Sequence, residues 1–194
     1  MAVAQKECAT SFVIINPATG KEVTTYAGHS DSEVEAILAD VGIAQKKWQA
    51  TSYAERAKHF RAIATQLRKE ADEIAKTMAL EMGKPITQGV AEVEKCAGNC
   101  DFYADNAEAM LADEKLKLET ARIQYQALGT VLAVMPWNFP FWQVLRCVAP
   151  VLMAGNAMVL KHSSNVMGCA VLLEEVLDRA GLPSFANLKT VCIG

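Results

Sequence analysis

The sequence contains little that would suit the chain for export, for a membrane or for nucleic acid. Its first ten residues carry charged side chains and lack the apolar core of a signal peptide. The longest apolar region, Val144–Leu160, is interrupted by Arg146, Pro150 and Gly155, which a lipid-facing helix tolerates poorly. No long basic block occurs, and the net charge is −3. These absences predict a cytoplasmic protein that acts on small molecules, with neither a membrane nor a nucleic acid as partner.

Metal-binding and disulfide patterns are also missing. The six cysteines are scattered, and the three histidines fall in unrelated contexts. Cys96 and Cys100 are four residues apart in an expected helix, so they share a face that could form half of a metal site. No further cysteine or histidine lies nearby to complete the shell. We therefore predict free thiols and no metal.

Charge is distributed unevenly along the chain. Of the 194 residues, 52% are hydrophobic, which is enough to build a real core. Only seven charged residues lie between positions 126 and 194, whereas the first 125 residues hold all the others. This change in composition predicts a boundary near residue 125, with an N-terminal region over 1–125 and the first part of a dinucleotide-binding domain over 126–194.

The N-terminal region has the pattern of a hairpin followed by helices. Phe12–Ile15 and Val23–Tyr26 are short strand candidates joined by a turn that contains Pro17 and Gly20. Arg122–Leu128 alternates enough to be another strand. Serines precede the first two expected helices as N-caps, and Gly83-Lys84-Pro85 separates the last two. The expected helices are Asp31–Gln49, Tyr53–Met82 and Ile86–Leu111.

After residue 125 strands and helices alternate, which predicts a doubly wound α/β sheet. The three strand candidates are almost uncharged, so we expect both of their faces to be covered. Such sheets bind ligands at the carboxyl ends of their strands, where Pro136-Trp137-Asn138 and Lys161-His162-Ser163-Ser164 fall. The expected strands are Thr130–Met135, Ala157–Leu160 and Leu188–Ile193, and the expected helices are Trp142–Met153 and Val166–Ala180.

Several motifs occur in the order and spacing of a known family. They are Asn16-Pro17-Ala18-Thr19-Gly20, Glu81-Met82-Gly83-Lys84-Pro85, Pro136-Trp137-Asn138-Phe139-Pro140, Ala154-Gly155-Asn156 and Lys161-His162-Ser163. On these motifs the chain resembles the aldehyde dehydrogenase superfamily over nearly its whole length. The stretches around Pro136–Arg146 and Lys161–Ala170 look most like the bacterial succinate semialdehyde dehydrogenases. The resemblance implies the N-terminal part of that fold, a helical region with hairpin strands that leads into an incomplete Rossmann-like sheet.

The resemblance assigns a catalytic role to Asn138. In the family a cysteine thiolate attacks the aldehyde carbon, and the resulting oxyanion must be stabilised before hydride leaves for the nicotinamide. Asn138 matches the side-chain amide donor that serves this purpose. The alternative is a loop asparagine that caps the helix beginning a few residues later. Trp137 is expected at the cofactor wall or, alternatively, in the apolar core.

The same resemblance predicts NADP or NAD as cofactor. It makes Lys161 a ligand of the adenosine ribose, with Pro136, His162 and Ser163 in the surrounding cofactor site. Many NAD-preferring relatives carry a glutamate three residues after this lysine, where the chain has Ser164. Without a carboxylate to repel the 2′-phosphate, NADP is expected to be accepted.

Arg146 is the candidate for substrate choice. It lies in an apolar helix, where a buried cation needs an anion. The resemblance supplies the distal carboxylate of succinate semialdehyde, which a guanidinium holds well, and places Phe139 at the same substrate site. An ion pair with a carboxylate elsewhere in the chain is the alternative.

The nucleophilic cysteine and the general-base glutamate of the family have no counterpart in the 194 residues. We therefore expect an aldehyde-oxidising activity in the complete enzyme, as a homo-oligomer, and no activity of this chain alone. The alternative is a noncatalytic short form that acts through association, because the hairpin and Arg122–Leu128 resemble the oligomerisation elements of the family.

Overall fold

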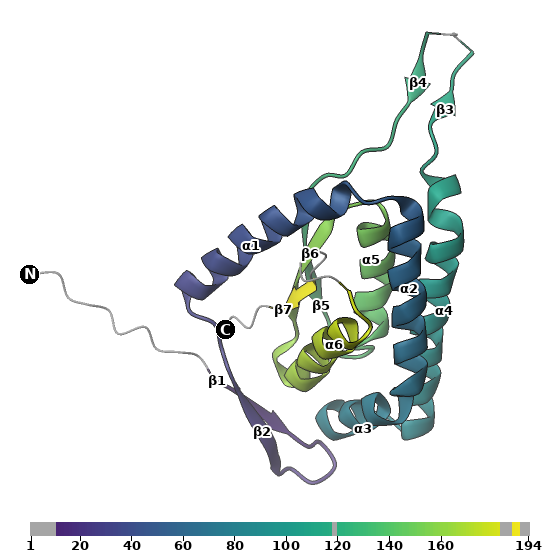
Figure 1. Ribbon diagram of the computed structural model, residues 1–194. Helices are drawn as coiled ribbons and strands as arrows, with labels where there is room; N and C mark the ends of the chain where they lie inside the picture. The colour runs from purple at the N-terminus through teal and green to yellow at the C-terminus, as the bar shows by residue number, and fades with distance from the viewer. Residues whose placement is uncertain (1–10, 118–119, 183–187, 191–194) are drawn as a thin grey trace, which may run out of the picture.

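The computed structural model describes residues 11–117, 120–182 and 188–190 (Figure 1). The chain opens with the expected antiparallel hairpin, formed by β1 (Ser11–Ile15) and β2 (Glu22–Ala27). Gly20 in the turn has a φ of 66°, a left-handed conformation that glycine adopts without a steric penalty. The hairpin prediction is confirmed, with each strand slightly longer than expected.

Four helices follow, namely α1 (Asp31–Gln49), α2 (Tyr53–Lys69), α3 (Ala71–Met82) and α4 (Ile86–Met110). The expected serine caps are confirmed, because Ser30 and Ser52 each form a capping box with the glutamate three residues later. Figure 1 shows α2 and α4 running side by side, to the right of the small sheet. Gly83 ends α3 in the left-handed conformation that a helix C-terminus favours.

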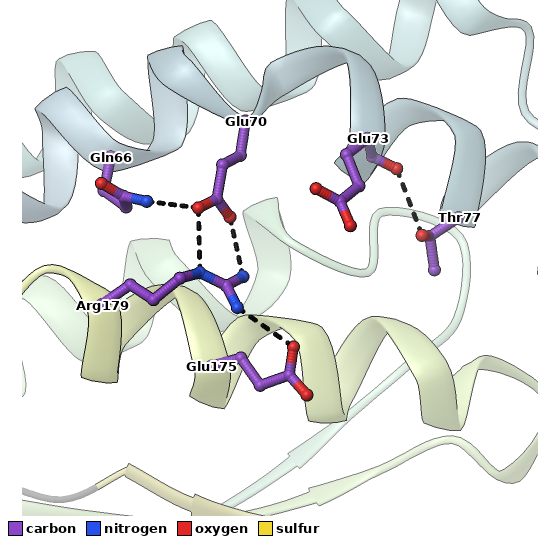
Figure 2. A network of polar contacts seen from close by, with 6 residues as sticks. All are labelled: Gln66, Glu70, Glu73, Thr77, Glu175 and Arg179. Atoms are coloured by element: carbon purple, nitrogen blue, oxygen red, sulfur yellow. Dashed lines mark hydrogen bonds and ion pairs between the residues drawn. The ribbon is translucent and has the colours of Figure 1, made fainter.

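The prediction of one continuous helix over Tyr53–Met82 was wrong, because the helix breaks at Glu70. At this break the Glu70 carboxylate accepts two hydrogen bonds, of 2.9 and 2.8 Å, from the guanidinium of Arg179 on a later helix (Figure 2). Gln66 also donates to Glu70, and Arg179 reaches Glu175. The break lets α3 turn to pack against that later helix. No glycine or proline marks it in the sequence.

The strand expected over Arg122–Leu128 is confirmed only for its first two residues. There β4 (Arg122–Ile123) pairs with β3 (Glu114–Lys115), which the sequence pattern did not suggest. This hairpin projects from the body of the molecule (Figure 1). A strand needs a partner, and β3 offers only two residues to pair with. The rest of the segment is an extended connection, and Leu128 is 93% exposed.

A parallel sheet follows, with strand order β5 (Thr130–Met135), β6 (Ala157–His162) and β7 (Leu188–Thr190). The connections are α5 (Trp142–Met153) and, after a single 3₁₀ turn η1 (Ser164–Val166), α6 (Met167–Arg179). The α/β prediction is confirmed. β6 runs two residues further than expected, and the expected end of the last strand, residues 191–193, lies outside the described residues.

Buried residues from both sides of position 125 form one main core, in which α2, α3 and α4 pack with α5, α6 and the inner face of the sheet. On the other face, Val41 of α1 packs against Ala157 and Val159 of β6. Because α1 crosses mainly β6, Leu132 and Val134 of β5 stay 66% and 67% exposed. The expectation that every strand is covered on both faces was therefore wrong for β5. The division at residue 125 stays a prediction. No helix in the described part of the chain is long and apolar enough to span a membrane.

Candidate functional site

Two segments with predicted site residues meet at the carboxyl edge of the sheet. Met135 at the end of β5 pairs with His162 at the end of β6, and Val134 pairs with Lys161. The exposed loop that carries Asn138 therefore begins next to the strand end that carries Lys161 and His162. Lys161 and His162 themselves belong to β6, rather than to the loop after it. Parallel strands of an open α/β sheet place a ligand at this edge.

Asn138 is exposed in the loop between β5 and α5. It does not act as the helix cap, because the residue at the N-cap of α5 is Phe141 and no side chain of the loop bonds to the first turn. The capping alternative for Asn138 therefore has no support in the geometry. Trp137 is 49% exposed, so it is not a core residue either. The loop presents both side chains outward.

The N-terminus of α5 is capped by a buried carboxylate from another helix. Glu92 of α4 accepts hydrogen bonds from the backbone N–H of Phe141 and of Trp142, at 3.0 and 2.9 Å. Its second carboxylate oxygen forms a buried ion pair with Lys84, whose ammonium also lies 3.9 Å from the ring centroid of Phe139. A negative charge at a helix N-terminus satisfies free N–H groups and favours the helix dipole.

His162 fixes the same loop from the sheet side. His162 is only 2% exposed; its ring Nδ1 accepts from the backbone N–H of Ser163 at 2.8 Å, and Nε2 lies 2.9 Å from the carbonyl oxygen of Pro140. This pair of contacts requires the neutral Nε2–H tautomer, which donates to Pro140. Burial, with a contribution from Lys161, lowers the pKa of His162 below its ordinary value.

We expect the stability of the full-length protein to fall on acidification because of His162. Its pKa is lower in the folded protein than the value of about 6.5 of an unfolded chain, so the unfolded state binds more protons below that pH. The free energy of unfolding should decrease as the pH falls through about 6.5. Thermal melts of wild type and His162→Gln across this range check it, because the glutamine keeps a donor for Pro140 and cannot titrate. His59, whose pKa burial also lowers, contributes to both proteins alike. Parallel curves for the two would contradict the assignment.

The cofactor residues predicted around Lys161 lie at the end of β6 and in the turn that follows it. Lys161 is half-buried and forms no ion pair with a carboxylate among the described residues, while Ser164 is exposed. The Ser163 hydroxyl donates to the Asn165 side chain at 2.6 Å. This region therefore presents one cation and hydroxyl groups, with no carboxylate at position 164. Such a donor set suits ribose hydroxyls and a 2′-phosphate.

Arg146 lies on the exposed side of α5. Within the described ranges no carboxylate forms an ion pair with it, so the alternative of an intramolecular ion pair has no support there. The expected helix is present, and α5 turns Val144, Leu145 and Val148 to the core and Arg146 away from it. Its guanidinium is open to an external anion.

A second buried glutamate caps α6 in the same way. Glu81 of α3 accepts from the backbone N–H of Gly168 and Cys169, at 2.7 and 2.8 Å. Position 168 has no room for a side chain, because an added Cβ would lie 2.4 Å from the Glu81 carboxylate and 2.7 Å from the Tyr26 hydroxyl. Sequence reasoning missed the roles of Glu81 and Glu92. The sequence does contain a signal, namely a carboxylate on an otherwise apolar helix face. Glu92, for example, lies four residues before Cys96 and so shares its buried face.

No cysteine in the described part of the chain is suited to be a nucleophile. Burial raises the pKa of Cys100 to about 12 and raises those of the other three thiols as well, so the reactive thiolate is disfavoured. Cys8 and Cys192 lie outside the described residues. No group of three potential metal ligands comes together among the described side chains. The four described cysteines, all free thiols, are Cys96, Cys100, Cys147 and Cys169.

Comparison with known proteins decides the family. The sequence pattern of the aldehyde dehydrogenase family matches residues 3–189. The chain belongs to the aldehyde dehydrogenase family. It is 50% identical over 185 residues to a probable succinate-semialdehyde dehydrogenase (NADP+) of Synechocystis sp., and 46% identical over 179 residues to the succinate semialdehyde dehydrogenase (NAD(P)+) Sad of Escherichia coli. These matches cover 93% and 90% of this chain.

Solved structures of the family agree with the fold. The succinic semialdehyde dehydrogenase of Streptococcus pyogenes, solved with NADP+ as the cofactor, matches 94% of this chain with a TM-score of 0.90 and 32% identity. The match covers 41% of that protein, and the chain spans 40% and 38% of the Synechocystis and Escherichia coli relatives. The chain therefore corresponds to the N-terminal part of an aldehyde dehydrogenase, as its motifs predicted.

Proposed function

We propose that the complete enzyme containing this chain oxidises succinate semialdehyde to succinate with NADP or NAD. The observation that carries the proposal is the exposed Asn138, held in a loop whose backbone is anchored on both sides, at the ligand-binding edge of an aldehyde dehydrogenase sheet. The named activity of the most similar relatives reported above supports the substrate.

In this proposal Asn138 acts on the oxygen of the reacting carbonyl. When a thiolate adds to an aldehyde, the carbonyl oxygen becomes negatively charged, and a fixed amide N–H placed beforehand stabilises that charge with little reorganisation. The exposed side chain has no hydrogen-bond partner among the described residues, so its amide is available for this purpose. The thiolate and the general base belong to the remainder of the enzyme.

The cofactor residues in the proposal are Lys161, Ser163 and Ser164, with Pro136 and Trp137 at the adjoining loop. The nicotinamide cofactor supplies the acceptor for the hydride that leaves the substrate carbon. Lys161 binds the ribose or its 2′-phosphate through its ammonium group, and Ser164 leaves that phosphate unopposed. His162 contributes from within the core, where its buried ring contacts the carbonyl oxygen of Pro140.

Ser164→Glu in the full-length enzyme should shift cofactor preference toward NAD. A carboxylate at this exposed position repels the 2′-phosphate of NADP and accepts hydrogen bonds from the ribose hydroxyls of NAD. Steady-state kinetics with each cofactor measure the ratio of the two kcat/KM values, with Ser164→Gln as an uncharged control of the same length. If the ratio is the same in wild type and both variants, Ser164 does not determine the preference.

The activity itself is tested with two purified proteins. The full-length enzyme should form NADPH from succinate semialdehyde, whereas the 194-residue chain should not, because none of its described cysteines can act as the nucleophile. Absence of activity with succinate semialdehyde in a folded full-length enzyme that oxidises other aldehydes would overturn the substrate. Turnover by the isolated chain, after removal of contaminating enzymes, would overturn the assignment of the nucleophile to the remainder.

A noncatalytic role through association is the second candidate, favoured by the projecting β3–β4 hairpin. The hairpin and the connection after it expose large apolar side chains, which are hallmarks of a protein contact. An isolated chain that assembles with itself or with the full-length enzyme in analytical ultracentrifugation, and that has no turnover, fits this role. These side chains are Leu116, Ile123, Tyr125 and Leu128.

A further inference from the structure

The loop that carries Asn138 is held by groups far away in the sequence. Glu92 lies 49 positions before Phe141, yet its carboxylate receives the first two N–H groups of the turn that begins α5. Glu92 and Lys84 are 4% and 7% exposed and form an ion pair with each other. Each of these groups therefore has a partner in the core, and the carboxylate connects α4 to the start of α5.

Because Glu92 caps α5, no side chain of the preceding loop is needed as the cap. A helix start is most often capped by a Ser, Thr, Asp or Asn immediately before the first turn. In α5 that position is Phe141, which has no polar side chain. With Glu92 as the acceptor, the Asn138 side chain is not needed to cap α5, and only two residues separate it from the anchored Phe141. A shift of the Phe141 backbone would be transmitted directly to the Asn138 amide.

We propose that Glu92, held in place by Lys84, is a positioning residue that sets the Asn138 amide for catalysis. This inference rests on the proposed function of Asn138 as the donor to the oxyanion. Geometry of this kind is worth much in catalysis, because a displacement of about 1 Å can cost roughly 100-fold in rate. Lys84 adds a second contact, through the face of the Phe139 ring next to Asn138.

The test compares two paired variants of the full-length enzyme that both lack the ion pair. Lys84→Met with Glu92→Gln keeps an oxygen acceptor for the N–H groups of Phe141 and Trp142, whereas Lys84→Met with Glu92→Leu removes it. Neither leaves an unpaired buried charge, and only the glutamine pair offers an oxygen acceptor at position 92. We expect kcat to be about 10- to 100-fold lower for the leucine pair than for the glutamine pair, with KM values for aldehyde and NADP within about twofold.

Glu81 supplies the matched control for a merely structural role. It caps α6 through two N–H groups as Glu92 caps α5, but its contacts are to Gly168 and Cys169. Glu81→Leu and Glu81→Gln should differ in melting temperature and not in kcat. If the leucine pair at Glu92 does not fold, the single variant Glu92→Gln is compared with wild type. The glutamine has one oxygen where the carboxylate has two, so it cannot accept from Lys84 and from the N–H groups of α5 as well as Glu92 does. We then expect a lower kcat at unchanged KM.

Combining each variant with Asn138→Ala separates the inference from the proposed function. If Glu92 acts through Asn138, the leucine and glutamine pairs have the same kcat once Asn138 is alanine. The inference is overturned if the two pairs still differ in kcat when Asn138 is alanine. It is also overturned if the two pairs have equal kcat when Asn138 is present. If Asn138→Ala alone leaves kcat unchanged, the proposed role of Asn138 fails, independently of Glu92.

Discussion

Asn138→Ala in the full-length enzyme is expected to lower kcat by about 10²- to 10³-fold, the usual cost of removing one donor to a developing oxyanion. The loss should appear mainly in kcat, because the amide contributes little until charge develops on the oxygen. The melting temperature should change little, since the side chain is exposed and forms no hydrogen bond with the described residues. Steady-state kinetics with succinate semialdehyde and thermal melts measure both quantities.

Asn156 is the matched control for this prediction. It is 7% exposed, accepts from the backbone N–H of Leu128 and Gly129 at 2.6 and 3.0 Å, and donates to Val151. Asn156→Ala removes three partly buried hydrogen bonds, each of which contributes about 0.5–1.5 kcal/mol to stability. We therefore expect Asn156→Ala to lower the melting temperature and Asn138→Ala to lower kcat. A large stability loss at Asn138, or full turnover without its amide, would contradict the assigned role.

The parts of the fold that follow from local chemistry were predictable from the sequence. α1 has the predicted bounds because a capping box opens it, and α5 has them although Pro150 lies within its last turn. β5 begins and ends as predicted, because Thr130–Met135 is an uninterrupted β-prone segment followed by Pro136. The loop that carries Asn138 could likewise be placed at a strand end from sequence alone.

The parts that depend on distant partners were not predictable in this way. At the break between α2 and α3, Glu70 pairs with Arg179, which lies 109 residues later in the chain. The pairing of β3 with β4 and the exposure of Leu132 depend on where neighbouring segments pass. The caps of α5 and α6 come from Glu92 and Glu81, so no local pattern reveals them. A carboxylate on an apolar helix face shows only that some partner must exist.

The two caps also bear on where a dinucleotide can bind. The N-terminus of a helix that follows a strand is a common binding site for phosphate. In this chain the N–H groups at the starts of α5 and α6 already donate to Glu92 and Glu81. These carboxylates therefore occupy the N–H groups that a phosphate would need. In the proposed enzyme we expect the diphosphate of the cofactor to be bound by other groups.

Arg146→Ala should weaken catalysis on succinate semialdehyde by roughly 1.5–3 kcal/mol, the contribution of a charge-assisted hydrogen bond. This corresponds to a loss in kcat/KM of about 10- to 150-fold. An uncharged aldehyde of similar length should be affected much less, because it has no carboxylate for the guanidinium to bind. The exposed position of Arg146 and its lack of an ion-pair partner among the described residues predict an unchanged melting temperature.

Two comparisons make the result at Arg146 specific. Arg146→Lys keeps the charge and loses the planar two-donor geometry, so its kcat/KM for succinate semialdehyde should lie between wild type and alanine. Arg61→Ala removes another exposed arginine, which pairs with Asp105 on the helical side of the molecule. This variant should leave kcat/KM unchanged for both aldehydes. If Arg146→Ala slows both aldehydes equally, the guanidinium does not read the distal carboxylate. If the guanidinium binds the carboxylate, kcat/KM for succinate semialdehyde should decrease from arginine to lysine to alanine at position 146. The value for the uncharged aldehyde should stay nearly constant, because only the charged substrate loses an ionic partner.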